Sequence, residues 1–240
     1  MIQSKYRFNA PVSLTKIAFN LPEKRINCDG NYHELSIGMN YFDIDKRKKA
    51  FIFELDDVLY PEKDYLFQVY YLFSALLEYT ELIDAKAATE LMINTYNTEG
   101  NDMVFDRLKE KFDVNDCYRT NLNHLFATAK LPLKLLLYKN MLNLLQEIVI
   151  DRKKVFIVTN GNPQQQLNKI KQTEWHGLEQ YLTAYFAEET MAKPEPDVIH
   201  LLLKDHDLLR RDILMIEDSE NDRLCADVCG IDYINVQEFL

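Results

Sequence analysis

Residues 49–60 read KAFIFELDDVLY, a short apolar run that ends abruptly in acidic residues. A continuous apolar run of this length is typical of a strand buried on both faces of a parallel sheet. Two further apolar runs, at 155–158 and 213–216, also end in polar residues, and a fourth covers 231–236. These four segments predict the strands of a parallel sheet.

Helical patterns separate the later strands from one another. We expect helices over Leu133–Ile150, Pro163–Lys171, Glu195–Lys204 and Asn221–Val228. This alternation of strand and helix predicts an α/β fold with a doubly wound, Rossmann-like parallel sheet and right-handed crossovers.

Residues 61–132 do not fit this alternation, because they are too long for a simple crossover. Their pattern predicts four helices, over Tyr65–Tyr79, Ala85–Thr95, Met103–Phe112 and Tyr118–Thr128. We interpret 61–132 as a helical cap inserted after the first core strand. Residues 49–60 and 133–240 then form the core, and 1–48 form an N-terminal extension.

The extension has a weaker pattern than the rest of the chain. Its turn signal, Asp29-Gly30, predicts a β-hairpin. Three roles are open for residues 1–48: pairing with a sheet edge, covering the cap, or mediating a homodimer.

Charge and composition narrow the class of partner. The formal net charge is −10, which argues against a general nucleic-acid binder and against a polybasic membrane anchor. The sequence has no signal-peptide pattern and no apolar stretch of roughly 20 residues. Its four cysteines form no CxxC pair, which favours reduced thiols. We therefore expect a cytoplasmic protein whose partner is a small molecule.

The acidic residues after the first strand are candidates for chemistry. In open parallel sheets, ligands bind outside the carboxyl ends of the strands. Glu54 and Asp56 are two residues apart, so their side chains point the same way while the strand persists. Such a pair can bind Mg²⁺ and do acid–base or nucleophilic work. Taken alone, the same acids would also suit a helix N-terminus.

The other strand ends supply the remaining groups of a phosphate site. A hydroxyl, an amide and backbone N–H groups, which can cradle phosphate at a helix start, come from Thr159, Asn160 and Gly161. Lys193, in the segment AKPEP, can neutralise phosphate charge, and Asp218 and Asp222 add carboxylates. The four clusters together predict a site for Mg²⁺ and a phosphate group.

With these motifs in this order, residues 49–240 resemble the haloacid dehalogenase-like superfamily, particularly its phosphatases with a helical cap. The family's first motif, Asp-x-Asp, appears as Glu54-Leu55-Asp56. Its second motif is matched by Thr159 in Thr-Asn-Gly, its third by Lys193, and its fourth by the pair Asp218 and Asp222. The Leu59-Tyr60-Pro61-Glu62 run looks like that of family phosphatases on small phosphometabolites.

The resemblance implies an Mg²⁺-dependent phosphomonoester hydrolase that works through an acyl-phosphate on a small phosphorylated metabolite. The first acid would attack phosphorus, and Asp56 would protonate the leaving oxygen and then activate water. Thr159 and Lys193 would hold the phosphoryl oxygens, with Asn160 and Gly161 beside them. The implied metal site comprises Glu54, Asp56, Asp218 and Asp222, of which Asp222 could instead orient Lys193.

The chain departs from the family at the nucleophile, where Glu54 replaces aspartate. The extra methylene moves the carboxylate by about 1.5 Å if extended. Three interpretations follow: a working phosphatase adjusted to Glu54, a weak or inactive relative that binds Mg²⁺ and phosphate as a sensor or interaction module, or an enzyme whose nucleophile is water.

Overall fold

The computed structural model describes residues 5–7 and 38–240. The hairpin predicted at Asp29-Gly30 lies outside the described residues.

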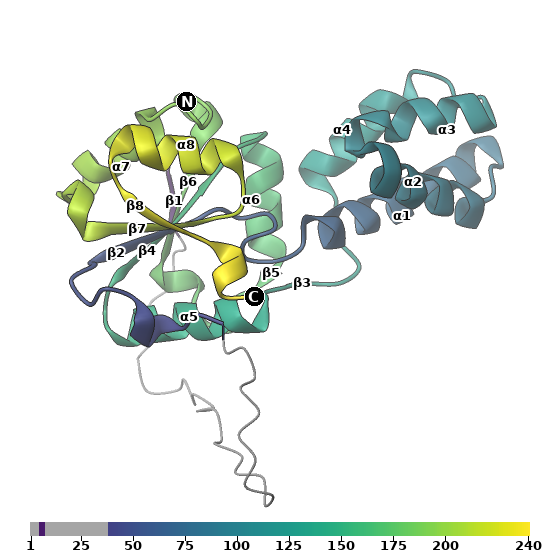
Figure 1. Ribbon diagram of the computed structural model, residues 1–240. Helices are drawn as coiled ribbons and strands as arrows, with labels where there is room; N and C mark the ends of the chain where they lie inside the picture. Colours follow the sequence, from purple (N-terminus) through teal and green to yellow (C-terminus); the bar gives the residue numbers. More distant parts are fainter. Residues whose placement is uncertain (1–4, 8–37) are drawn as a thin grey trace, which may run out of the picture.

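The described part of the chain contains a six-stranded sheet in the order β1-β6-β4-β2-β7-β8 (Figure 1). Its strands are β1 (Lys5–Arg7), β2 (Ala50–Phe53), β4 (Lys154–Thr159), β6 (Leu182–Phe186), β7 (Ile213–Glu217) and β8 (Asp232–Asn235). All neighbours run parallel except β1, which pairs antiparallel with β6. The predicted doubly wound parallel sheet is confirmed, and residues 5–7 of the extension do pair with a sheet edge.

Helices cover both faces of this sheet. One face carries α5 (Lys139–Ile150) and α6 (Pro163–Gln172), and the other carries α7 (Asp197–His206) and α8 (Glu220–Cys229) (Figure 1). In β2, Phe51 and Phe53 pack in the core with α5, whereas Ala50 and Ile52 pack in the core with α7 and α8. Burial on both faces explains why this strand is an unbroken apolar run.

The strand order reverses at β2. From β2 the chain moves outward through β4 and β6, then returns to place β7 on the other side of β2. Such a switch point leaves a crevice at the carboxyl ends of the central strands, because the loops leave in opposite directions. This is the end of β2 at which Glu54 and Asp56 stand.

Two segments were predicted incorrectly. The strand β6 was not expected, because Thr183 interrupts the apolar run by which the other strands were recognised. The helix predicted over Leu133–Ile150 begins only at Lys139. Its first leucines instead form β3 (Leu135–Leu136), which pairs with β5 (Thr173–Glu174). The spacing of leucines alone does not distinguish the buried face of a helix from a short β-strand.

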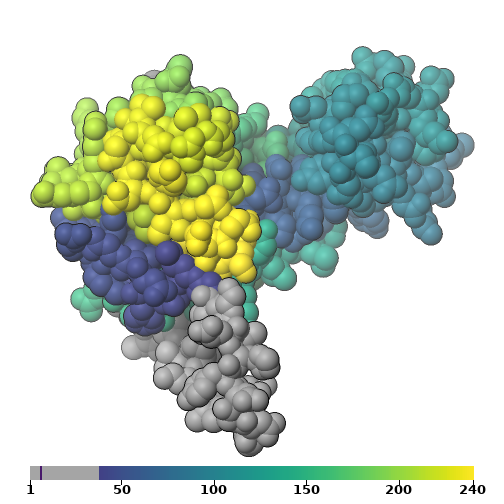
Figure 2. Space-filling model, viewed as in Figure 1, coloured from purple at the N-terminus to yellow at the C-terminus, as the bar shows by residue number. Residues whose placement is uncertain are grey.

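The four helices predicted in 61–132 are present as α1 (Glu62–Glu81), α2 (Ala85–Glu99), α3 (Val104–Phe112) and α4 (Tyr118–Thr128). We call residues 62–128 the helical subdomain; it lies to one side of the sheet (Figures 1 and 2). Helix α1 buries a stripe at helical spacing, including Tyr65, Val69 and Phe73. No helix of the described part is long and apolar enough to cross a membrane.

Candidate active site

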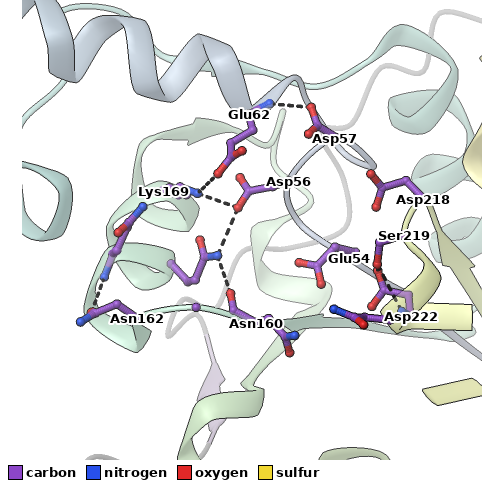
Figure 3. A pocket seen from close by; sticks show the side chains of 14 residues that line it. Glu54, Asp56, Asp57, Glu62, Asn160, Asn162, Lys169, Asp218, Ser219 and Asp222 are labelled. Carbon is purple, nitrogen blue, oxygen red and sulfur yellow. Dashed lines mark hydrogen bonds and ion pairs between the residues drawn. The ribbon is translucent and has the colours of Figure 1, made fainter. Parts of the chain in front are cut away.

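A pocket of about 350 Å³ lies at the carboxyl ends of the central strands (Figure 3). Its lining comprises Glu54, Asp56, Asp57, Glu62, Asn160, Gly161, Asn162, Gln165, Gln166, Lys169, Asp218, Ser219, Asn221 and Asp222. Thr159 and Lys193 are buried next to it, and Lys193 contacts two of the lining carboxylates. The structure therefore brings all eight predicted site residues to one place.

The turn after β2 directs the two acids of the first motif into this pocket. The Glu54 N–H donates to the Ile216 carbonyl of β7 at 3.4 Å, so the strand pairing persists to this residue. The chain then turns at Asp57, which has a φ of 57°. The Asp57 N–H donates to the Tyr60 carbonyl at 2.8 Å, and its Oδ1 accepts from the Glu62 N–H at 2.9 Å, which starts helix α1.

Glu54, Lys193 and Asp222 form a buried cluster that we call the first triad. The Lys193 ammonium pairs with both carboxylates and donates to the Val158 carbonyl at 2.9 Å. Exposed fractions are 8% for Glu54, 3% for Lys193 and 2% for Asp222. Oε1 of Glu54 also accepts from the Leu55 N–H at 2.7 Å, so both Glu54 oxygens have a donor.

Burial perturbs the ionisation of this triad. Burial raises the pKa of Glu54, which Lys193 partly offsets and Asp222 reinforces. Burial alone would lower the pKa of Lys193, but its attraction to Glu54 and Asp222 holds that pKa above the usual value. Lys193 therefore stays positively charged beside the pocket.

Asp56, Lys169 and Glu62 form a second cluster, the second triad (Figure 3). Lys169 Nζ lies 2.6 Å from Asp56 Oδ2 and 3.6 Å from Glu62 Oε1, and only 1% of the lysine side chain is exposed. Asp56 Oδ1 accepts from the Tyr60 hydroxyl at 3.0 Å, and Oδ2 accepts from Gln166 Nε2 at 3.1 Å. Burial raises the pKa of Glu62, and repulsion from Asp56 adds to this.

The second motif fastens the Lys193 segment to the sheet. Asn160 Nδ2 donates to the Lys193 carbonyl and Asn160 Oδ1 accepts from the Lys193 N–H, both at 2.9 Å. Its side chain is thus engaged with backbone, and its predicted contact with phosphate stays a prediction. Gly161 has a φ of 97°, a conformation that favours glycine, and a Cβ there would meet Gln166 Nε2 at 3.2 Å.

The fourth motif starts helix α8. Ser219 caps the helix: its Oγ accepts from the Asp222 N–H at 3.2 Å and donates to Asp222 Oδ2 at 2.7 Å. Asp218 points into the pocket near Asp57 (Figure 3). Partial desolvation, with repulsion from Asp222, Asp57 and Glu54, raises the pKa of Asp218 to about 7.

The pocket is rich in oxygen ligands for a cation. The described lining has an excess of carboxylates over lysines, from Glu54, Asp56, Asp57, Glu62, Asp218 and Asp222. Within residues 5–7 and 38–240, however, no three or more His, Cys, Asp or Glu residues are grouped to hold a metal ion. Lys193 draws Glu54 and Asp222 toward itself, and Lys169 draws Asp56. The donors and the charge suit Mg²⁺, which needs only one or two carboxylates with water and phosphate; the four predicted ligands stay a prediction.

Sequence reasoning missed Lys169, Gln166, Glu62 and Tyr60. A signal for the first two was present, because Gln166 and Lys169 are three residues apart on a helix that begins at the second motif. That helix must start at the crevice, so its inward polar residues face the pocket. Lys171, two positions after Lys169, does not share this spacing with Gln166 and is exposed.

Comparison with solved structures supports the fold. A provisionally named β-phosphoglucomutase from Thermotoga maritima has a TM-score of 0.53 at 18% identity, covering 76% of this chain and 82% of that chain. A hydrolase of family IA, variant 3, from Entamoeba histolytica has a TM-score of 0.52 at 16% identity, covering 78% and 83%. A haloacid dehalogenase-family hydrolase from Deinococcus radiodurans with bound phosphate and sodium has a TM-score of 0.51 at 18% identity, covering 80% and 81%.

Sequence comparison gives the family directly. Among curated proteins no relative matches the chain. The family model described as haloacid dehalogenase-like hydrolase matches residues 51–236, which include both triads and the whole pocket lining. With its sheet order and its four motif positions gathered at one pocket, this chain belongs to the haloacid dehalogenase-like hydrolase family.

Proposed function

We propose that the protein is an Mg²⁺-dependent phosphomonoester hydrolase acting on a small phosphorylated metabolite. The observation that carries the proposal is the convergence of Glu54, Asp56 and the charged Lys193 at one pocket of about 350 Å³. Family membership supports hydrolysis, and the Deinococcus radiodurans hydrolase of the same fold has bound phosphate.

In the proposed reaction, a Glu54 oxygen bonds to phosphorus as the ester P–O bond breaks. The leaving oxygen keeps the electron pair of that bond and takes a proton from protonated Asp56. Water then bonds to phosphorus and gives a proton to Asp56, while Glu54 departs as a carboxylate and phosphate is released. Lys193 holds the phosphoryl oxygens throughout, and Thr159 assists it.

Asp218 and Glu54 would hold the Mg²⁺, with Asp56 and Asp222 beside them. When bound, the ion would neutralise charge on the phosphoryl oxygens. The raised pKa of Asp218 supports this assignment, because it reflects partial desolvation together with nearby negative charge that a cation would compensate. Asp222 would act mainly on Lys193, with which it pairs.

Residues 61–132 would serve as the cap that selects the substrate, with 49–60 and 133–240 as the core and 1–48 as an extension. Helix α1 supports this role, because it is the first helix of the helical subdomain and begins at Glu62, which lines the pocket. The proposed location is the cytoplasm, without a nucleic-acid or membrane partner. Homodimerisation is left open.

A second candidate function is a binding module that holds Mg²⁺ and a phosphate ligand without turnover. One observation favours it. Both oxygens of Glu54 already accept a hydrogen bond, from the Leu55 N–H and from Lys193, so the protein holds this carboxylate in place and restricts its movement toward phosphorus. The longer side chain makes these contacts at the position where the family has aspartate.

A screen of phosphomonoesters with Mg²⁺, repeated with EDTA, separates the two candidates. We expect slow, EDTA-sensitive release of phosphate by the wild type, and a phosphoprotein trapped on Glu54. Glu54→Asp should then raise kcat by about tenfold, because misplacement by about 1 Å is costly. If the wild type turns over nothing and Glu54→Asp creates activity, the native protein is a binding module. Turnover without a phosphoprotein would indicate a water nucleophile.

A further inference from the structure

Each acid of the first motif has its own buried lysine. Glu54 pairs with Lys193, which occupies a motif position, whereas Asp56 pairs with Lys169, which does not. We propose that Lys169 is a positioning residue that holds the Asp56 carboxyl group in place for proton transfer at the scissile oxygen. The inference rests on the proposed function, because it is there that Asp56 donates and accepts a proton.

The contacts of Asp56 define its orientation almost completely. Lys169 Nζ at 2.6 Å and Gln166 Nε2 at 3.1 Å both approach Oδ2, while the Tyr60 hydroxyl approaches Oδ1 at 3.0 Å. Donors on both oxygens fix rotation about the last bond of the side chain. A carboxyl group held in this way faces one fixed position in the pocket, to which it can give a proton and from which it can take one. Such fixed orientation raises the rate of a reaction.

Lys169 is held as firmly as the carboxylate that it orients. Its side chain is 1% exposed, and its ammonium lies 5.0 Å from the ring centroid of Tyr65 and 3.6 Å from Glu62. A buried ammonium is costly unless it is paired. Lys169 lies on α6, a helix of the core, and Asp56 lies on the turn after β2. Through this ion pair, helix α6 helps to fix the position of Asp56.

Gln166 offers a buried hydrogen-bond acceptor close to Asp56. Its Nε2 donates to Asp56 Oδ2 and to the Asn160 carbonyl, so the orientation of the amide is set. Its Oε1 is buried and has no hydrogen-bond partner among the described residues. A buried acceptor of this kind costs stability. A water or hydroxyl that donates to Oε1 would stand beside Asp56, where the proposed proton transfer takes place.

The test uses the dependence of the rate on the leaving group. We compare the full-length wild type with Lys169→Met, Lys169→Arg and the control Lys171→Met, which changes an exposed lysine of the same helix. The substrates are glycerol 2-phosphate, whose alkoxide needs a proton to leave, and p-nitrophenyl phosphate, whose phenolate does not. For Lys169→Met we expect kcat/KM to fall about a hundredfold for the first ester and less than tenfold for the second.

Lys169→Arg keeps the positive charge and should recover much of the loss on glycerol 2-phosphate, and Lys171→Met should match the wild type. An equal loss on both esters in Lys169→Met would overturn the inference, because it would indicate only structural damage. If Lys169→Met does not fold, Lys169→Arg decides by the same split: its shifted donor should cost more on glycerol 2-phosphate than on p-nitrophenyl phosphate.

A second measurement does not depend on turnover. Lys169→Met should lower the thermal unfolding midpoint, because it leaves the partly buried Asp56 carboxylate without its cation. Adding Asp56→Asn should restore most of the loss. If the wild type hydrolyses no ester of the phosphomonoester screen, the proposed function fails, and this cycle still decides whether Lys169 holds Asp56. Independent, additive losses in the two single variants would overturn the contact itself.

Discussion

Each of the two triads pairs one buried lysine with two carboxylates, but the two differ in how far their carboxylates are exposed. In the first, Lys193 lies between Glu54 and Asp222, and all three side chains are at most 11% exposed. In the second, Lys169 is equally buried, but Asp56 is 16% and Glu62 33% exposed. The first triad joins segments of the sheet domain alone, whereas the second includes Glu62, the first residue of α1. The first triad therefore suits phosphate binding, and the second would link Asp56, the proposed proton-transfer group, to the helical subdomain.

The largest expected effect on stability comes from removing the positive charge of the first triad. Lys193→Met leaves two carboxylates buried without their cation, and we expect a loss of about 3–5 kcal/mol in the free energy of unfolding. Lys169→Met should lose less, because Glu62 reaches water. Urea denaturation of both variants, with Lys171→Met as the reference, measures the difference. Equal losses would mean that the two triads are energetically alike.

A glycine substitution tests the second triad indirectly. Gly161→Ala places a Cβ 3.2 Å from Gln166 Nε2 at a φ of 97°, so both backbone strain and a displaced Gln166 are expected. We expect a loss of about 1–2 kcal/mol in stability and about tenfold in kcat.

Gly177 supplies the matched control. Its φ is 85°, yet a Cβ there meets nothing within 4 Å. Gly177→Ala should therefore show the strain without the loss of kcat. If both variants keep full activity, the Gln166 contact is unimportant for Asp56.

A smaller effect is expected at the exposed end of the second triad. Glu62→Gln removes one partner of Lys169 but keeps the contact to Asp56, and a partly exposed pair is worth little. We expect kcat/KM for p-nitrophenyl phosphate to change by about threefold or less. A change above tenfold would place Glu62 itself in substrate binding.

The smallest effect concerns Asp218, which the first triad repels. Its pKa rises from 3.8 to about 7, so between these values the folded protein binds this proton more tightly than the unfolded chain. Stability without metal should therefore fall as pH rises from about 4 to 7. Solvent around the carboxylate should keep the change below about 1 kcal/mol.

Asp218→Asn is the check on this pH dependence. Thermal unfolding measured across pH should lose that slope in the variant, and Mg²⁺ at pH 8 should stabilise the wild type more than the variant. An unchanged slope would assign the pH dependence to other groups.

Much of the site was predictable because strand ends converge in a doubly wound sheet. Once residues 50–53, 154–159 and 213–217 were recognised as parallel strands, Glu54, Thr159 and Asp218 had to lie together. Pairings made by tertiary contact were not predictable. Neither the ion pair of Lys169 with Asp56 nor the hydrogen bonds of the Asn160 amide to the Lys193 backbone could be assigned in advance. Strand β6 became evident only through its pairing with β1 and β4.

The pairing of β1 with β6 has a consequence for the association of the protein with other chains. Without β1, the strand β6, LTAYF, would form the outer edge of the sheet on that side. An apolar edge strand offers an unfilled row of backbone donors and acceptors to other chains, a common starting point for aggregation. Lys5–Arg7 pair with three of the five residues of β6, Tyr185, Ala184 and Thr183, and we expect this short covering strand to reduce self-association at that edge.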